Sequence, residues 1–298
     1  MKNYRVIFPY ITTSIIPDDL LSRLENNAFH PLKDGQFRTS GFALLNESER
    51  VIFSDNRHLF YFCEQSRKAD IKTVRHIYNE RYQKIIDEGR EVSEETAEAM
   101  KAAASSEALK YAPIKQSGVY ILFDAPAGRL WCAGSTVKKC EEALKKLRTV
   151  LGSLDTEPLI FSTLAKRLAR HIEGTGIRLH EQLYIPACGK VVAGDDTGFP
   201  VATFNGVDIR TRDVGNVLAG LYVISAEMQL QNGRREALAS FTLAASPGGA
   251  VSLKGLEFAG GGDDSTDDAR HASDMQIVAK TCGQIFTLLA DFLNAKDA

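Results

Sequence analysis

The chain has 298 residues, 44% of them hydrophobic and 25% charged, and a formal net charge of −2. This composition is typical of a globular protein that buries a core in one large domain or two closely packed ones. No apolar run has the length of a membrane span or of a signal peptide's apolar segment, which favours a cytoplasmic protein without a membrane partner. The five cysteines are scattered and form no CxxC pair, so free buried thiols are favoured over disulfides or zinc ligands.

The charge is unevenly distributed along the chain. Residues 138–178 carry nine Lys or Arg against five acidic residues, whereas residues 257–298 carry three against eight. A protein that coats DNA usually has a basic balance. A DNA-binding chain of this composition must therefore gather its cations on one surface.

The first third of the chain predicts a small sheet with one helix. Residues 4–11 are apolar enough for an opening strand. Short β-type runs, separated by turn residues, follow at residues 37–45, 51–54 and 59–63. Between them, Pro17 precedes a short leucine stripe, a position where the first turn of a helix tolerates proline.

Residues 67–116 predict a helical arm made of two long helices. The first spans residues 70–88, and the second begins after Ser93 and continues to about residue 109, before Pro113. We expect the apolar residues of the first helix to form its buried face: Ile71, Val74, Tyr78, Tyr82, Ile85 and Ile86. Its cations are dispersed and have acidic neighbours, so three of them are weak candidates for DNA contact: Lys72, Arg75 and Lys84.

A hairpin followed by an amphipathic helix organises the middle of the chain. The hairpin spans residues 120–132 with a Pro-Ala-Gly turn, and the helix spans residues 137–151. Ser135 can cap the start of this helix, and Gly152 supplies the left-handed residue that ends it.

The next segment, residues 162–172, predicts a helix with the most one-sided basic face of the chain. Its apolar stripe is narrow, and no acidic residue occurs before Glu173. Three cations project to one side: Lys166, Arg167 and Arg170. A solvated face and a DNA contact are about equally compatible with this pattern.

The last third predicts a three-stranded meander and a final helix after an irregular, glycine-rich stretch at residues 173–213. The strands are expected at residues 222–230, 237–243 and 251–258, the first two joined by a two-residue Asn232-Gly233 turn. The final helix begins near Asp274 and places one apolar face toward the core: Val278, Cys282, Ile285, Leu289 and Phe292.

Motifs for catalysis are absent from the sequence. It contains no P-loop, GxSxG, HExxH or dinucleotide glycine fingerprint, so we expect no catalytic residue, no metal site and no cofactor. The acidic loop near the C-terminus could hold Mg²⁺ or Ca²⁺ as in a nuclease, although its spacing is more typical of a solvated linker. Its residues are Asp263, Asp264, Asp267, Asp268 and His271.

Several short motifs occur in an order that is typical of one family. FHP at residues 29–31 follows the first helix, and KKLR, LGSL and PL occupy residues 145–148, 151–154 and 158–159. LKGLEF at residues 253–258 then precedes the acidic loop and the C-terminal helix. In these motifs and their order the chain resembles the recombination-associated protein RdgC family.

The resemblance implies an α+β fold of mixed and antiparallel sheets with packed helices and a helical arm, in one horseshoe-shaped unit over residues 1–298. Within that unit we distinguish an N-terminal β-rich part (1–66), the arm (67–116), a hairpin-helix and irregular middle part (117–215), and a meander with the C-terminal helix (216–298). It further implies a non-enzymatic, nucleoid-associated cytoplasmic protein that forms a ring-shaped homodimer. Duplex DNA passes through such a ring without sequence preference, and the bound protein restrains RecA-driven strand exchange, with RecA or its filament as an indirect partner.

The resemblance also extends the set of candidate residues. Arg210 and Arg212 stand where the family places residues of the DNA-facing wall, and a two-fold contact is expected near the arm at Pro113, Ile114, Lys115 and Gln116. Two alternatives remain. One is a protein-interaction module on the same scaffold with little DNA affinity, and the other is a metal-dependent nuclease that uses the acidic loop.

Overall fold

The computed structural model describes residues 2–259 and 267–295 of the chain. Its contacts divide the chain into two compact units. Unit 1 contains Met1–Arg23, Leu44–Tyr61 and Val119–Ala298, and unit 2 contains Leu24–Ala43 and Phe62–Gly118. In the described part of the chain, no helix is both long enough and apolar enough to cross a membrane.

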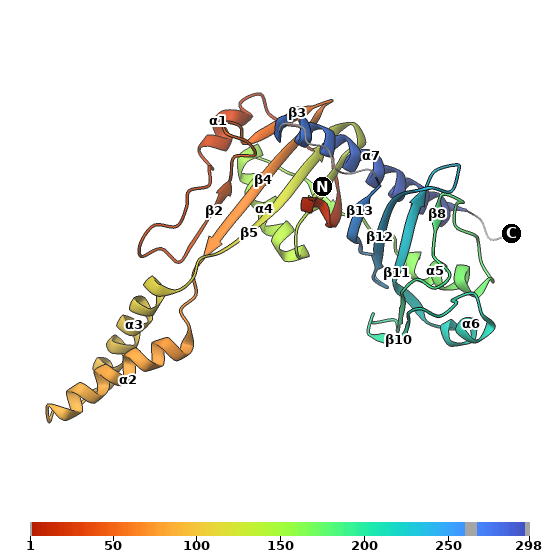
Figure 1. Ribbon diagram of the computed structural model, residues 1–298. Helices are drawn as coiled ribbons and strands as arrows, with labels where there is room; N and C mark the ends of the chain where they lie inside the picture. Colours follow the sequence, from red (N-terminus) through yellow and green to blue (C-terminus); the bar gives the residue numbers. More distant parts are fainter. Residues whose placement is uncertain (1, 260–266, 296–298) are drawn as a thin grey trace. The chain divides into compact units, whose positions relative to one another are not determined.

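An antiparallel sheet forms the centre of unit 1 (Figure 1). Its strands follow the order β10-β9-β11-β12-β13-β1-β6-β5, with β7 also beside β1, β8 beside β11, and β3 beside β4. The α+β class predicted from the sequence is confirmed. The strands span Val6–Thr12 (β1), Val51–Ser54 (β3), Arg57–Ser66 (β4), Lys115–Asp124 (β5), Arg129–Ala133 (β6), Thr156–Pro158 (β7), Leu183–Tyr184 (β8), Val191–Gly194 (β9), Pro200–Phe204 (β10), Tyr222–Gln231 (β11), Ala237–Ala245 (β12) and Val251–Phe258 (β13).

Helices cover both faces of this sheet (Figure 1). On one face α4 (Val137–Leu151) brings the Cys140 thiol within 3.9 Å of the Cys132 carbonyl oxygen. On the other face α7 (Asp267–Asn294) stacks the Phe286 ring on Trp131, with 5.7 Å between ring centroids, and α5 (Leu164–Glu173) shares the same core. Successive residues of a strand point to opposite faces, so Cys132 and Trp131 belong to different layers. The predicted core face of α7 is confirmed, since all five of its residues are buried.

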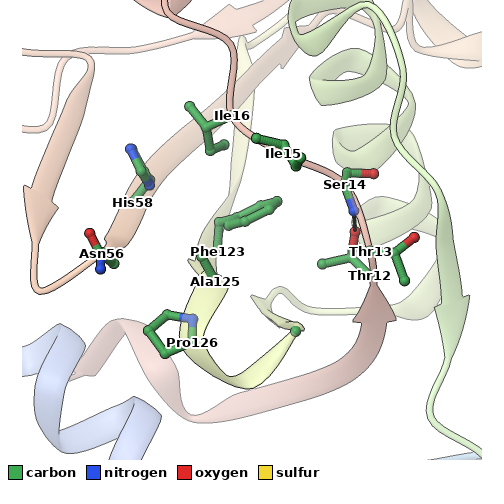
Figure 2. A pocket seen from close by; sticks show the side chains of 11 residues that line it. Thr12, Thr13, Ser14, Ile15, Ile16, Asn56, His58, Phe123, Ala125 and Pro126 are labelled. Atoms are coloured by element: carbon green, nitrogen blue, oxygen red, sulfur yellow. Dashed lines mark hydrogen bonds between the residues drawn. The ribbon is translucent and has the colours of Figure 1, made fainter.

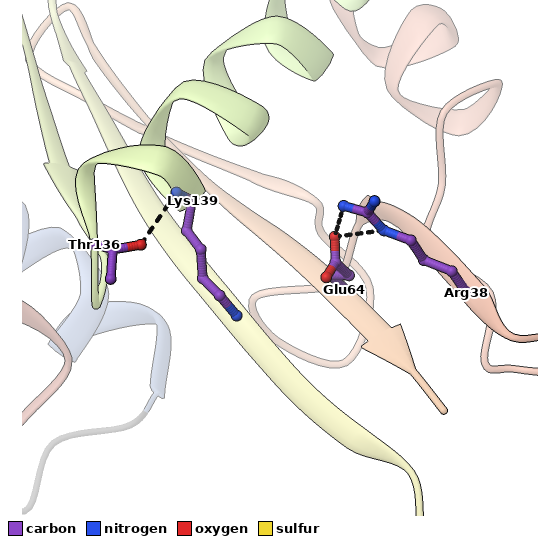
Figure 3. Close-up of polar contacts among 4 residues, drawn as sticks. All are labelled: Arg38, Glu64, Thr136 and Lys139. Atoms are coloured by element: carbon purple, nitrogen blue, oxygen red, sulfur yellow. Dashed lines mark hydrogen bonds and ion pairs between the residues drawn. The ribbon is translucent and has the colours of Figure 1, made fainter. Parts of the chain in front are cut away.

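The hairpin and helix predicted in the middle of the chain are confirmed, with one correction at the cap. Strands β5 and β6 are joined by a short 3-10 helix (Ala125–Ala127) and by Gly128 in the left-handed conformation. Thr136, not Ser135, caps α4, because its hydroxyl oxygen accepts the N–H of Lys139 at 3.3 Å (Figure 3). Gly152 ends the helix with φ of +83°, a conformation that costs glycine little.

The last third follows the predicted meander, with differences in the turns. The loop between β11 and β12 is longer than the two residues predicted. The Asn232 N–H donates to the Glu236 carbonyl, and Arg235 adopts a positive φ of 63°. The sequence did not indicate two elements: β9, which lies in the stretch taken as irregular, and α6 (Arg212–Leu218), which begins at the end of that stretch. Of the five free cysteines, four are buried as predicted, and Cys188 is exposed.

Unit 2 holds the predicted pair of long helices, α2 (Ile71–Asp87) and α3 (Glu94–Tyr111). Their N-caps are Asp70 and Ser93, whose side chains accept the N–H groups of the residues three positions later. In the same unit β2 (Arg38–Phe42) pairs with the second half of β4, where Arg38 also forms an ion pair with Glu64 (Figure 3). The short helix predicted after Pro17 is α1 (Leu20–Glu25).

The predicted buried face of α2 is wrong. No residue of this helix is buried, and Ile71 is 70% exposed. Its neighbour α3 presents small residues, of which Ala104 and Ala108 are buried, and Arg81 forms an ion pair with Glu107 across the two helices. The apolar period therefore identifies one side of α2, but that side is only partly covered within the described chain.

Candidate nucleic-acid interface

Helix α5 presents two of its three predicted cations to solvent. Leu164 and Leu168 are buried in the core of unit 1, and this orientation leaves Lys166 and Arg170 exposed one helical turn apart. Gly174 closes the helix in the left-handed conformation. Lys166 and Arg170 therefore remain candidates for phosphate contact.

Arg167 is a correction to the predicted basic face. Its Nη1 atom donates to the carbonyl oxygens of Phe292 and Ala295, at 2.8 and 3.0 Å. The Phe292 carbonyl lies in the last turn of α7, and Ala295 directly follows the helix. The last carbonyls of a helix have no N–H donor within the helix, and this end carries a partial negative charge. Arg167 thus ties α5 to α7 and does not share the exposed face of Lys166 and Arg170.

Replacing Arg167 by alanine is therefore expected to reduce stability and not DNA affinity. The variant should lose about 1–3 kcal/mol of unfolding free energy, because two charge-assisted hydrogen bonds disappear and the carbonyls lose their donor. Urea unfolding followed by circular dichroism measures this loss. Arg170→Ala is the matched control and should lose about 0.5 kcal/mol or less. Equal losses in the two variants would contradict this role for Arg167.

Arg210 and Arg212 lie in the segment that leads into α6, which contacts α5. The Asp208 carboxylate accepts the N–H of Arg210 at 3.0 Å and so orders the turn before the helix. The guanidinium of Arg210 lies 5.7 Å from the centre of the Tyr184 ring, and both arginines are exposed. The fold thus brings cations from two separated segments, α5 and the start of α6, to neighbouring elements.

Arg178 joins these cations and was not selected from the sequence. It lies in the exposed loop after α5, and its charge and that of Arg210 both act on His171. Burial is the main cause that lowers the pKa of His171 below its usual value; a hydrogen bond between the imidazole and the Ile177 backbone opposes the shift, and the two guanidinium charges add to it. The Leu179 N–H donates to His171 Nδ1 at 3.3 Å. We call Lys166, Arg170, Arg178, Arg210 and Arg212 the α5–α6 cation group.

The three cations predicted on the arm are exposed on α2. The acidic residues near them, which were expected to pair with these cations, contact other side chains. Glu80 lies 3.5 Å from His76, Asp87 accepts from Gln83, and Glu88 pairs with Arg90. Lys72 and Arg75 are three residues apart and share one side of α2, whereas Lys84 lies on another side, so the three cations form no common face. DNA contact by these three residues stays a prediction, and all three belong to unit 2.

The predicted two-fold contact lies at the beginning of β5, directly after α3. Pro113, Ile114, Lys115 and Gln116 are exposed, and Ile114 is exposed by 45%. The Gln116 side chain accepts a hydrogen bond from Gln65 at 2.9 Å within unit 2. The segment is therefore accessible and locally ordered, as a contact surface requires.

The acidic loop lies largely outside the described residues. Of its members, only the His271 side chain is described, and its Nε2 atom lies 3.2 Å from the Leu45 carbonyl oxygen. Within residues 2–259 and 267–295, no three His, Cys, Asp or Glu side chains gather closely enough to hold a metal ion.

A pocket of about 660 Å³ in unit 1 was not indicated by the sequence (Figure 2). His58 contributes its titratable side chain, and its ring packs against Phe53, Phe60 and Phe123. Burial lowers the His58 pKa, which keeps the ring neutral. The described lining residues include no carboxylate, so this pocket differs from the acidic sites of metal-dependent nucleases.

Two comparisons with known proteins bear on these surfaces. A family model described as "Putative exonuclease, RdgC" matches residues 2–175. The chain belongs to the RdgC family. The "Recombination-associated protein RdgC" of Shewanella loihica (strain ATCC BAA-1088 / PV-4) is 26% identical over 164 residues, which are 54% of this chain and 53% of the relative. The match therefore spans about half the length of that relative.

The part matched to the RdgC family contains the arm, α4 and α5, with Lys166 and Arg170. It ends before Arg178, Arg210 and the meander strands. The names of the family model and of the relative also differ, since one names an exonuclease and the other a recombination-associated protein. The two names therefore do not decide the biochemical role of this chain, and only its own residues bear on that role.

Proposed function

We propose that this RdgC-family chain takes part in recombination by binding double-stranded DNA without sequence preference. The observation that supports the proposal is the α5–α6 cation group, which gathers exposed Lys and Arg side chains on contacting elements of unit 1. Lys and Arg bind phosphate oxygens, which are the same at every base pair. A chain of net charge −2 can bind DNA in this way because its cations are segregated.

The proposal includes a homodimer that closes as a ring around the duplex and restrains RecA-driven strand exchange. A closed two-fold ring needs two self-complementary contacts in each subunit. The exposed segment Pro113–Gln116 supports one of them. The binding is proposed to be non-enzymatic and to place the protein on the nucleoid of the cytoplasm.

Titrating duplex binding with salt tests the DNA-binding proposal. If the five cations each neutralise one phosphate, the affinity should fall roughly 500-fold between about 50 and 200 mM salt. Two duplexes of unrelated sequence should give equal curves in fluorescence anisotropy. Absent or salt-independent binding would favour the protein-interaction module instead.

Incubation of duplex DNA with Mg²⁺ tests the nuclease alternative. The duplex ends should stay intact. Degradation of the ends that depended on Asp263 or Asp264 would assign a nuclease activity.

The chain is expected to have twice the 32.7 kDa mass of one subunit in solution. Static light scattering at micromolar concentration measures this mass. Ile114→Asp should shift the mass toward the monomer, because a buried carboxylate at a contact is costly. Leu238→Asp, at a residue that is 39% exposed, serves as the matched control and should leave the dimer intact. A monomer for the unchanged chain would contradict the ring.

A further inference from the structure

Three segments that lie far apart in the sequence form the pocket of about 660 Å³ in unit 1 (Figure 2). They are residues 12–16, the start of β4 with the turn before it, and the end of β5 with the turn after it. Phe123 opposes Leu130 in the β5–β6 register and so points to the face of the sheet on which Cys132 contacts α4. Helix α5 packs in the core on the other face, so the pocket is separate from the α5–α6 cation group.

The described residues that line the pocket include no Lys, Arg, Asp or Glu. His58 is the titratable member of the lining, and burial lowers the pKa of its imidazole, which is therefore neutral at neutral pH. A phosphate or carboxylate that entered the pocket would lose hydration without meeting a cation. The volume lies in the range of sites for small organic ligands. Charge and volume together favour an uncharged organic ligand.

The His58 ring supplies an independent sign of a ligand. Its Nδ1 atom is buried and has no hydrogen-bond partner within the described part of the chain, although a buried polar atom normally has one. The rings packed around it, of Phe53, Phe60 and Phe123, offer no hydrogen-bonding group. The χ2 torsion of histidine has a broad, roughly two-fold preference, so rotation of the ring can turn either edge toward the pocket. A ligand with a polar edge would supply the partner that the protein lacks.

Asn56 adds an amide group two residues before His58 (Figure 2). Ser54 pairs with Arg57, so Asp55 and Asn56 form a two-residue hairpin turn, with positive φ of 50° and 58°. The Asn56 side chain is exposed and forms no hydrogen bond with other described residues. An amide and a neutral imidazole can each donate and accept a hydrogen bond. The start of β4 therefore presents donors and acceptors together.

Apolar side chains supply most of the remaining wall. Phe123 is buried against the sheet, whereas Ile15 is 86% exposed although it lines the pocket. The segment that contains Ile15 is held in place, because the Thr12 hydroxyl donates to the Asp155 carbonyl and the Ser14 hydroxyl accepts the Asp155 N–H, both at 2.8 Å. A flat ligand between these walls would remove apolar surface from water.

A planar heteroaromatic ring with donors and acceptors along its edge matches these features. Asparagine amides pair with the edge of adenine, and aromatic side chains stack on bases. We propose that this pocket binds a nucleobase, with its edge at Asn56 and His58 and its faces toward Phe123 and Ile15. The base belongs either to a free nucleoside or to an unpaired position of a DNA strand. The second source rests on the proposed DNA binding, and the first does not.

Isothermal titration of the full chain with 2′-deoxyadenosine tests the pocket. We expect a dissociation constant on the order of 0.1–1 mM. Because the nucleoside is uncharged, this constant should not change with salt, unlike duplex binding by the α5–α6 cation group. Either proposal can therefore fail while the other holds. Indole has a similar ring system but a single donor, and it should bind about tenfold more weakly.

Two variants remove the polar edge of the pocket. His58→Phe retains an aromatic ring and removes both nitrogens, and Asn56→Gly removes the amide while allowing the positive φ. Each should weaken deoxyadenosine binding about tenfold. His76→Phe, on the exposed surface of α2, and Asp55→Gly, in the same turn but outside the lining, are the matched controls. Each control should change the affinity by less than about twofold.

Duplexes that contain 2-aminopurine, either paired or opposite an abasic site, distinguish the two sources of the base. Tighter binding of the duplex with the unpaired base, lost in His58→Phe, would support a DNA base. Deoxyadenosine binding without this preference would support a free nucleoside. Absence of deoxyadenosine binding up to about 10 mM, together with equal binding of the two duplexes, would overturn the proposal. Indole that bound as tightly as deoxyadenosine, or equal losses in His58→Phe and His76→Phe, would overturn it as well.

Discussion

Replacing Lys166 and Arg170 together by alanine is expected to weaken binding of every duplex by roughly 60-fold at about 0.1 M salt. Each phosphate contact contributes about 0.9 to the slope of log affinity against log salt, so the slope should fall by about 1.8. Both residues lie on the exposed side of α5. Because phosphates carry no sequence information, duplexes of different sequence should lose the same factor. Fluorescence anisotropy between about 50 and 200 mM salt measures affinity and slope together.

The matched control removes the same charge from other exposed helix positions of unit 1. Lys145→Ala with Lys280→Ala does so on α4 and α7 and should leave the slope within about 0.3 of that of the unchanged chain. Both double variants should fold, since exposed charges rarely contribute more than about 0.5 kcal/mol. Unchanged affinity and slope in the Lys166 and Arg170 variant would remove α5 from the interface. The proposal would then depend on Arg178, Arg210 and Arg212.

The elements that local sequence patterns specify were predictable. The hairpin of β5 and β6, helix α4 and the core face of α7 each have a strong period and clear end signals, and the structure contains them. The shorter elements were not predictable, because the few residues of β9 or α6 contain too little of a period. The cap of α4 was assigned one residue too early. Ser135 and Thr136 are chemically equivalent candidates, and backbone geometry decides between them.

The predicted burial of the apolar face of α2 was wrong for a different reason. A period shows which residues of a helix share a side, but burial also requires a neighbouring element that covers this side. The neighbour α3 is rich in alanine, so little side-chain surface is available to cover Ile71 or Tyr82. Coverage is a property of the tertiary structure and is not contained in the helix sequence.

The candidate interface was predictable only where its residues share one helix. Lys166 and Arg170 follow from their spacing, whereas Arg167 was misplaced because its partners are carbonyl groups more than a hundred residues away. The influence of Arg210 on His171 likewise depends on the contact between α5 and α6.

The second large expected effect concerns a buried charge network on the α7 side of the sheet. Asp124 at the end of β5 is 1% exposed; its carboxylate accepts from Arg57 Nε at 2.9 Å and from Trp131 Nε1 at 3.3 Å. Arg129 lies in register with Asp124, and its Nη1 atom is buried without a hydrogen-bond partner among the described residues. Burial lowers the Arg129 pKa, and the Asp124 charge opposes that shift. One carboxylate therefore stabilises two guanidinium groups.

Asp124→Ala is expected to reduce the unfolding free energy by about 3–5 kcal/mol, because it leaves both guanidinium groups in a poorly solvated site without their counter-charge. Chemical unfolding of the chain, followed by circular dichroism, measures this loss. The control is Glu257→Ala, which breaks an ion pair with Arg5 of the same length, 2.9 Å, whose side chains are 63% and 65% exposed. Its loss should not exceed about 1 kcal/mol. Adding Arg57→Leu to Asp124→Ala should restore part of the stability, since one uncompensated charge is then removed. A loss for Asp124→Ala as small as that for Glu257→Ala would show that water reaches the network and that burial does not amplify the interaction.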